Sequence, residues 1–218
     1  MRIISLLLST RLYLLWFFLY QGQTLGAYFK RARVFITGYP RSGNTFLTKL
    51  LCQFWPWGSV RSHLHNIYPL KYALKKEIPV IIVIRDPVEC YSSSVLKLGD
   101  NWFRKRLQYW RLRHWYTYVL ENKQILKVDF EELVTRPEEI VDKLLTKHRI
   151  KIPADIVLAA SNVASHTILN DTRSPYENGA PNVKKEIAKT KIKSSVDLTD
   201  LQNYWNEKRE EYRCIGSL

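Results

Sequence analysis

A run of small and polar residues, Gly38-Tyr39-Pro40-Arg41-Ser42-Gly43-Asn44-Thr45, has the composition of a loop that binds an anion. It follows a β-branched and aromatic run, 34–37, and precedes residues 45–55, whose apolar side chains recur at helical spacing. Between a strand and a helix, backbone N–H groups and the helix N-terminus together favour a phosphate. The spacing is that of a nucleotide P-loop, but Asn44 stands where a triphosphatase needs lysine. The cation here is Arg41.

A second basic motif, Arg85-Asp86-Pro87-Val88-Glu89-Cys90-Tyr91-Ser92-Ser93, follows the apolar run 79–84, which is typical of a strand buried on both faces. A helix is expected to begin near Pro87. The Arg85 guanidinium can hold phosphate oxygens at two places, and Ser93 on the following helix adds a neutral donor. The sequence therefore has two candidate phosphate sites, each directly after a strand.

Residues 39–47 resemble the 5′-phosphosulfate loop of the sulfotransferases that use 3′-phosphoadenosine 5′-phosphosulfate (PAPS), and residues 85–93 resemble the 3′-phosphate motif of that family. The resemblance implies a sulfotransferase that moves a sulfuryl group from PAPS to a hydroxyl acceptor, with a carbohydrate or lipid-linked hydroxyl favoured. No metal site is expected. The residues implied to bind PAPS and its product PAP (adenosine 3′,5′-bisphosphate) are Arg41, Ser42, Gly43, Asn44, Thr45, Phe46, Arg85 and Ser93.

The resemblance also implies a catalytic base. His63 lies 22 residues before Arg85, which is the separation between the catalytic histidine and the 3′-phosphate arginine in the cytosolic branch of the family. We expect His63 to take the acceptor proton, while Arg41 and the loop amides stabilise charge on the leaving 5′-phosphate and Arg61 adds charge near the transferred group. His65 is a rival base, and membrane-anchored carbohydrate sulfotransferases often use a carboxylate instead.

Three features depart from the family pattern. Phe46 stands where a tryptophan often stacks on adenine, and Phe130 stands where the family has a tyrosine. Near the C-terminus two basic positions are occupied by Glu177 and Asn178. Their charge is expected to come from one of three lysines, Lys184, Lys185 or Lys189.

The fold class follows from apolar patterning and from the residues that begin and end helices. A third strand is expected at 124–128, a helix from Pro137 to Leu145, an aromatic and basic helix at 101–120, a mobile loop at 175–193 and a closing helix at 198–212. Strands that alternate with helices predict a parallel sheet. The expected fold is therefore α/β, a P-loop-NTPase-like three-layer fold with a central parallel sheet flanked by helices.

Composition narrows the function classes further. The chain has 218 residues, of which 46% are hydrophobic and 13% aromatic, so one buried core is expected and a disordered tail is excluded. The net charge of +14 indicates an anionic partner. The three cysteines, Cys52, Cys90 and Cys214, lack zinc-type spacing, so reduced thiols and no structural metal are expected.

Residues 3–20 are mostly apolar, with Arg11 near their centre. A membrane anchor, a signal peptide cut near Gly26, and a helix packed on the domain or lying in the membrane interface all fit. We favour membrane contact through this segment. The basic residues at 30, 31 and 33 then predict a cytoplasmic location or the cytoplasmic face of a membrane. The expected division is an N-terminal hydrophobic segment, 1–30, and a sulfotransferase domain, 31–218.

Two other functions fit parts of the sequence. The basic and aromatic segment 102–113 suits a non-enzymatic nucleic-acid-binding protein, although a polyanionic cofactor also explains the charge. A nucleotide-dependent phosphotransferase fits the loop spacing, but Asn44 argues against triphosphate binding. Sulfuryl transfer is the favoured interpretation, with a nucleotide and a hydroxyl acceptor as partners and no nucleic acid.

Overall fold

Four short strands form one parallel sheet in the part of the chain that the computed structural model describes, residues 15, 17–19, 22–55, 58–62, 64–99, 118–119, 122–147 and 183–216. The strands are β1 (Val34–Gly38), β2 (Val60–Ser62), β3 (Val80–Ile84) and β4 (Leu126–Asp129). Their order in the sheet is β2-β1-β3-β4, and every neighbouring pair is parallel. All five residues of β1 and of β3 are buried, as expected for strands covered on both faces.

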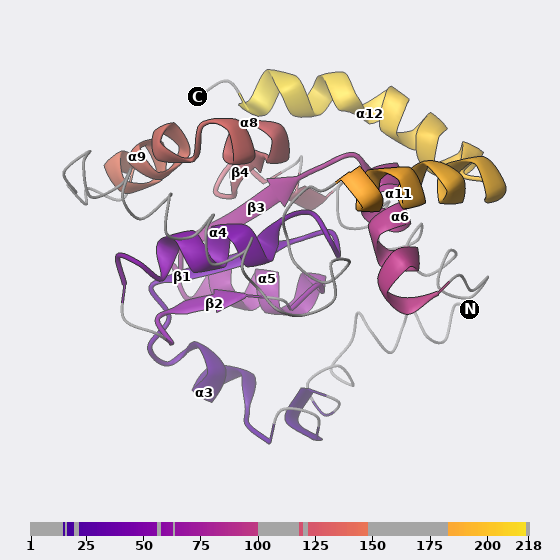
Figure 1. The fold of residues 1–218 in the computed structure, drawn as a ribbon. Helices are drawn as coiled ribbons and strands as arrows, with labels where there is room; N and C mark the ends of the chain where they lie inside the picture. Colours follow the sequence, from indigo (N-terminus) through magenta and orange to yellow (C-terminus); the bar gives the residue numbers. More distant parts are fainter. Residues whose placement is uncertain are drawn as a thin grey trace.

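Helices cover both faces of this sheet, which confirms the expected three-layer α/β fold (Figure 1). One face presents Val34, Ile36 and Val83 to α4 (Asn44–Leu51), α8 (Phe130–Thr135) and α9 (Pro137–Lys147). The opposite face presents Phe35 and Ile82 to α3 (Leu25–Phe29), α5 (Ile67–Lys75), α6 (Pro87–Leu98) and the later helix α12 (Thr199–Gly216). Successive strand residues thus alternate between two apolar cores.

The path of the chain through the sheet determines where a ligand can bind. After β1 the chain passes through α4 on one face to β2, and after β3 it passes to α6 on the other face. Because β1 and β3 are neighbours, the loops at their carboxyl ends diverge to opposite sides of the sheet. In open α/β sheets, ligands bind in the crevice at such a switch point. The two basic motifs of the sequence follow these two strands.

Most predicted elements around the motifs are confirmed. The run 34–37 is β1, extended by Gly38, and the run 79–84 is β3. Pro87 begins α6, where the Asp86 side chain accepts a hydrogen bond from the Val88 N–H at 2.7 Å. The third predicted strand begins two residues late, at Leu126, and the helix at Pro137 continues to Lys147.

The prediction of a mobile loop at 175–193 is wrong for its second half, and residues 175–182 lie outside the described part of the chain. Residues Val183–Ser195 form helix α11, which packs against α6 (Figure 1). Its lysine-rich sequence has little apolar face, so its contact with α6 depends largely on ion pairs. The closing helix predicted at 198–212 is α12.

Within the apolar run 3–20, only residues 15 and 17–19 are described, and these are helical. Phe17 is fully buried and meets the Tyr28 ring edge to face at 5.6 Å, whereas Leu15, Phe18 and Leu19 are exposed. Among the described residues, no helix combines the length and apolarity that a membrane crossing requires. Membrane contact, the division at residue 30 and the location in the cell stay predictions. The predicted helix at 101–120 is described only at 118 and 119.

Candidate functional site

The loop after β1 is folded tightly over the end of its own strand. Arg41 has a φ of 72° and Gly43 a φ of 107°, and the Ser42 N–H donates to the Tyr39 carbonyl oxygen at 3.1 Å. A Cβ atom on Gly38 would lie 2.7 Å from Ser42 Oγ and 2.8 Å from Asn44 Oδ1. Only glycine permits this close return of the loop onto β1. Gly43 then caps α4, so the helix N-terminus opens onto the loop.

Two polar side chains are buried inside this loop. Ser42 is fully buried and Asn44 is 4% exposed. Within the described residues, Ser42 Oγ and Asn44 Oδ1 have no hydrogen-bond partner, although a buried hydroxyl without a partner costs about 1–3 kcal/mol. The Ser42 hydroxyl can donate to an anion held at the helix N-terminus. Of the other predicted contacts, Thr45 is exposed and Phe46 is partly buried against the core on the α4 face.

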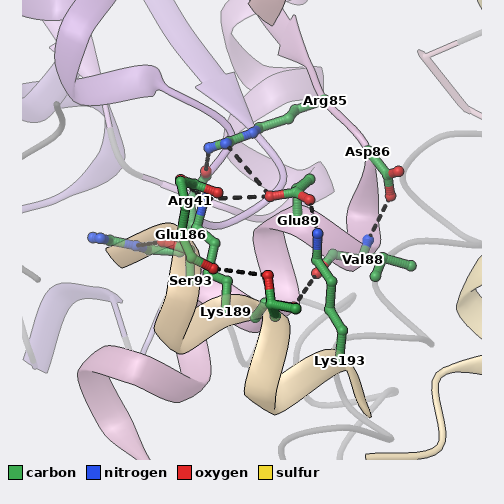
Figure 2. Close-up of polar contacts among 11 residues, drawn as sticks. Arg41, Arg85, Asp86, Val88, Glu89, Ser93, Glu186, Lys189 and Lys193 are labelled. Carbon is green, nitrogen blue, oxygen red and sulfur yellow. Dashed lines mark hydrogen bonds and ion pairs between the residues drawn. The ribbon is translucent and has the colours of Figure 1, made fainter. Parts of the chain in front are cut away.

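The structure brings the two basic motifs together. Arg85 Nη1 donates to the Arg41 carbonyl oxygen at 3.3 Å, and Arg41 Nε donates to Ser93 Oγ at 3.3 Å (Figure 2). Ser93 is 3% exposed and lies on α6. Arg41, Arg85 and Ser93, which follow two different strands, therefore lie together, and their two guanidinium groups and one hydroxyl suit the binding of two phosphate groups of one ligand.

Phe130, the first residue of α8, lies against both motifs. The Arg85 Cζ atom is 3.9 Å from the centroid of the Phe130 ring, which is a close cation–π contact. A Cβ atom on Gly43 would lie 2.6 Å from Cδ2 of the same ring. Phe130 itself is held at the start of α8 because Asp129 caps that helix, accepting from the Glu131 N–H at 2.7 Å. Both motifs are thus in contact with one aromatic side chain.

A carboxylate, Glu89 in the first turn of α6, lies four residues after Arg85 and is close to three cations (Figure 2). Its oxygens are 3.9 Å from Arg85 Nη2 and 3.2 Å from Lys189 Nζ, and Lys193 Nζ also donates to it. Lys189 is only 2% exposed and makes a second ion pair of 2.7 Å with Glu186. Because each lysine belongs to α11, Glu89 attaches that helix to the second motif.

These ion pairs shift the pKa of Glu89. Burial alone raises that pKa, but hydrogen bonds and charge from Lys193 and Lys189 outweigh burial, so the pKa is lowered from 4.5. Asp86, which caps the same helix, has its pKa raised, mainly by burial. Cys90, fully buried on α6, has its pKa raised to about 12 by burial, so its thiol is unreactive at neutral pH.

Replacing Glu89 with glutamine is expected to lower stability in a pH-dependent way. A carboxyl group whose pKa is lowered by folding stabilises the native state above its unfolded value, and this contribution is lost as pH falls through the folded value. The unfolding free energy of Glu89→Gln should therefore be about 1 kcal/mol below that of the wild type at pH 7, allowing for partial exposure. The difference should shrink below pH 4.5. Denaturant unfolding at a series of pH values measures this.

The matched control for Glu89→Gln is Glu207→Gln, which removes an exposed carboxylate of α12. It is expected to lower the unfolding free energy at pH 7 much less than Glu89→Gln does, because exposed ion pairs contribute little to stability. If Glu89→Gln lowers the unfolding free energy by the same amount at pH 7 and at pH 3, the effect does not come from the Glu89 charge.

The predicted base, His63, lies outside the described residues, and its role stays a prediction. Its rival His65 is partly buried, with Nδ1 2.7 Å from the Gly38 carbonyl oxygen at the start of the loop. A carbonyl oxygen only accepts, so Nδ1 carries the proton in this contact. Arg61 lies on β2 with its guanidinium carbon 4.9 Å from the centroid of the Tyr28 ring. The structure therefore places Arg61 beside α3.

No family model matches the sequence, and the search of curated proteins gave no match. The structure is similar to that of mouse sulfotransferase SULT7A1 complexed with PAP, with a TM-score of 0.52, covering 88% of this chain and 92% of that chain. This chain has a sulfotransferase fold. At 14% identity the likeness establishes the fold alone.

Within the sulfotransferase fold of this chain, sequence reasoning identified the loop after β1, Arg85 and Ser93, and the structure brings these together. It missed the stacking of Phe130 under Arg85 and the pairing of Glu89 with α11. The only sequence signal for Glu89 is that it follows Arg85 by four residues, in the first turn of the helix predicted to begin near Pro87. Of the three candidate lysines, Lys189 reaches this motif through Glu89.

Proposed function

We propose that this protein is a PAPS-dependent sulfotransferase that transfers a sulfuryl group to a hydroxyl-bearing acceptor, with a carbohydrate or lipid-linked hydroxyl favoured. The observation that carries the proposal is the hydrogen bond between the two motifs, from Arg85 Nη1 to the Arg41 carbonyl oxygen at 3.3 Å. It joins the proposed 5′-phosphate loop to the proposed 3′-phosphate arginine at the carboxyl ends of the neighbouring strands β1 and β3. The sulfotransferase fold, shared with a mouse sulfotransferase complexed with PAP, supports the same assignment.

The residues at the carboxyl ends of these two strands fit such a nucleotide. The loop offers backbone N–H groups at the N-terminus of α4 and the buried Ser42 hydroxyl, which has no partner within the described residues. Arg85 and Ser93 offer a guanidinium and a hydroxyl at the end of β3. Because Asn44 replaces the lysine that a triphosphatase needs, the donor set favours a nucleotide with separate 5′ and 3′ anions over ATP with magnesium.

PAPS, when bound, supplies the sulfuryl group that is transferred. Arg41 and the loop amides bind and stabilise the 5′ anion, and Arg41 does so as a permanent cation because a guanidinium keeps its proton. Arg85 and Ser93 fix the position of the 3′-phosphate. His63 accepts the proton of the acceptor hydroxyl, and an imidazole has a suitable ordinary pKa for this task.

Ligand-induced stabilisation tests the proposal against its two rivals. A ligand that binds only the native state raises its stability, by about 2.7 kcal/mol at 100 times the dissociation constant. PAP at that excess should therefore raise the melting temperature by about 5–10 °C, whereas ATP with magnesium and a single-stranded oligonucleotide should not. A shift with ATP and magnesium alone would favour a phosphotransferase, and a shift with the oligonucleotide alone would favour a nucleic-acid-binding protein.

Transfer itself is tested with sulfur-labelled PAPS and a panel of sugar, lipid-linked and phenolic acceptors. The proposal predicts labelled product with at least one hydroxyl acceptor, most strongly with a carbohydrate or lipid-linked one. The His63→Ala variant should bind PAP as the wild type does and yield no product. Loss of PAP affinity together with unchanged turnover would contradict the role given to His63.

A further inference from the structure

The ring of Phe130 lies where the two proposed phosphate-binding motifs meet. It belongs to a third segment, α8, which follows β4 and carries neither motif. The ring is 7% exposed, and it is packed in the same apolar core as Leu47 and Val83. Its position is therefore determined by the core and not by solvent. A ring held rigidly in this place can fix the positions of the groups that pack against it.

The first of these neighbours is the loop glycine. The ring approaches Gly43 so closely that a Cβ atom there would be 2.6 Å from Cδ2 and 2.8 Å from Cε2 of Phe130. Such an approach is possible only with a glycine, whose φ of 107° also suits that residue. Phe130 is consequently held on one side by the backbone of the loop that is proposed to bind the 5′ anion.

The second neighbour is the guanidinium of Arg85. Its Cζ atom is 3.9 Å from the ring centroid, which is close enough for the guanidinium to rest on the ring face. A planar guanidinium that rests on a ring can rotate only about an axis perpendicular to both planes. The other contacts of Arg85, to the Arg41 carbonyl oxygen and to Glu89, then fix that rotation. A lysine in place of Arg85 has no planar guanidinium to rest on the Phe130 ring.

We propose that Phe130 is a positioning residue of the nucleotide site, with its ring, held against Gly43, fixing the plane in which Arg85 presents its guanidinium to a phosphate. This inference rests on the proposed function and adds the residue that orients the 3′-phosphate arginine. It assigns to Phe130 a role that needs the aromatic face and no hydroxyl group. A leucine fills much of the same core volume but offers no face to a cation.

A double-mutant cycle tests this role, because it separates coupling to Arg85 from loss of core packing. The variants are Phe130→Leu, Phe130→Tyr, Arg85→Lys and the double variant Phe130→Leu with Arg85→Lys. The probe is PAP, measured by calorimetry, with inorganic phosphate as a second probe. We expect Phe130→Leu to weaken PAP binding by about 5- to 30-fold and Phe130→Tyr by less than about 3-fold. In the Arg85→Lys background, Phe130→Leu should weaken PAP binding further by less than about 2-fold.

Equal losses for Phe130→Leu in both backgrounds would overturn the inference, because the ring would then act on packing alone. If the wild type binds phosphate but not PAP, the proposed function is overturned. The double-mutant cycle is then measured with phosphate, and it still tests the role of Phe130. Binding of neither probe by the wild type would overturn both. If Phe130→Leu fails to fold, the inference is tested by NMR on the wild-type protein without ligand. The side-chain Nε–H proton of Arg85 in the wild type should resonate upfield of that of exposed Arg136, and the absence of this ring-current shift would overturn the inference.

Discussion

Replacing Gly43 with alanine is expected to weaken nucleotide binding strongly and to destabilise the protein. The new Cβ atom would overlap the Phe130 ring, at 2.6 Å from Cδ2. The alanine would also have to keep the φ of 107° that Gly43 has. Backbone strain of this kind costs about 1–3 kcal/mol, and overpacking of a buried site costs about another 1–3 kcal/mol. The loop or the ring must move, so the N–H donors no longer converge on an anion. Calorimetry with PAP should show a loss on the order of 100-fold, since charge-assisted hydrogen bonds contribute about 1.5–3 kcal/mol each.

Gly58→Ala is the matched control for this experiment. Gly58 has a comparable φ of 91°, but a Cβ atom there has no neighbour within 4 Å in the part of the chain that the structure describes. The control variant therefore carries the backbone strain without the overlap. It should lose about 1–3 kcal/mol of unfolding free energy and should bind PAP as the wild type does. If Gly43→Ala and Gly58→Ala bind PAP equally well, the loop after β1 does not hold the nucleotide.

Replacing Arg85 with methionine is expected to remove the preference for a nucleotide that carries a 3′-phosphate. The wild type should bind PAP far more tightly than adenosine 5′-monophosphate, because only PAP reaches both motifs. Without the guanidinium, the charge-assisted hydrogen bonds to the 3′-phosphate are lost, at about 1.5–3 kcal/mol each. The ratio of the two affinities should therefore fall by about 10- to 100-fold. Competition binding with both nucleotides measures this ratio directly.

The control for charge is Arg136→Met, which removes an exposed arginine between α8 and α9. It should leave the affinity ratio unchanged, since its ion pairs with Glu132 and Glu139 lie at the surface. An equal loss of affinity for both nucleotides in Arg85→Met would have a different meaning. Arg85 would then act through its hydrogen bond to the Arg41 carbonyl oxygen, and the 3′-phosphate would be held elsewhere.

The strands and the motifs were predictable because their signals are local. A continuous apolar run such as 80–84 has few alternatives to a buried strand, and a glycine-rich turn before an amphipathic segment indicates a loop at a helix N-terminus. The meeting of the two motifs also follows from sequence once a parallel sheet is assumed, because carboxyl ends of neighbouring strands lie at one edge. Arg41, Arg85 and Ser93 lie together as that reasoning requires.

Other parts of the fold depend on contacts between distant residues. β2 has only three residues, two of them polar, and its strand character comes from pairing with β1. Helix α11 lacks an apolar stripe, so the sequence suggested a mobile loop; its buried Lys189 is paired with Glu89, 100 residues away along the chain. The role of Phe130 depends on Gly43 and Arg85, which belong to two other segments. No local pattern indicates such contacts.

The central claim is that the loop after β1 and the arginine after β3 bind opposite ends of one nucleotide. The most direct test is a titration of isotope-labelled protein with PAP, in which the backbone amide of Gly43 and the side-chain Nε–H of Arg85 are followed by NMR. The account predicts that both signals shift along one binding curve and saturate at one nucleotide per chain. Two curves with different midpoints, or a shift at one group while the other stays unchanged at saturation, would contradict it.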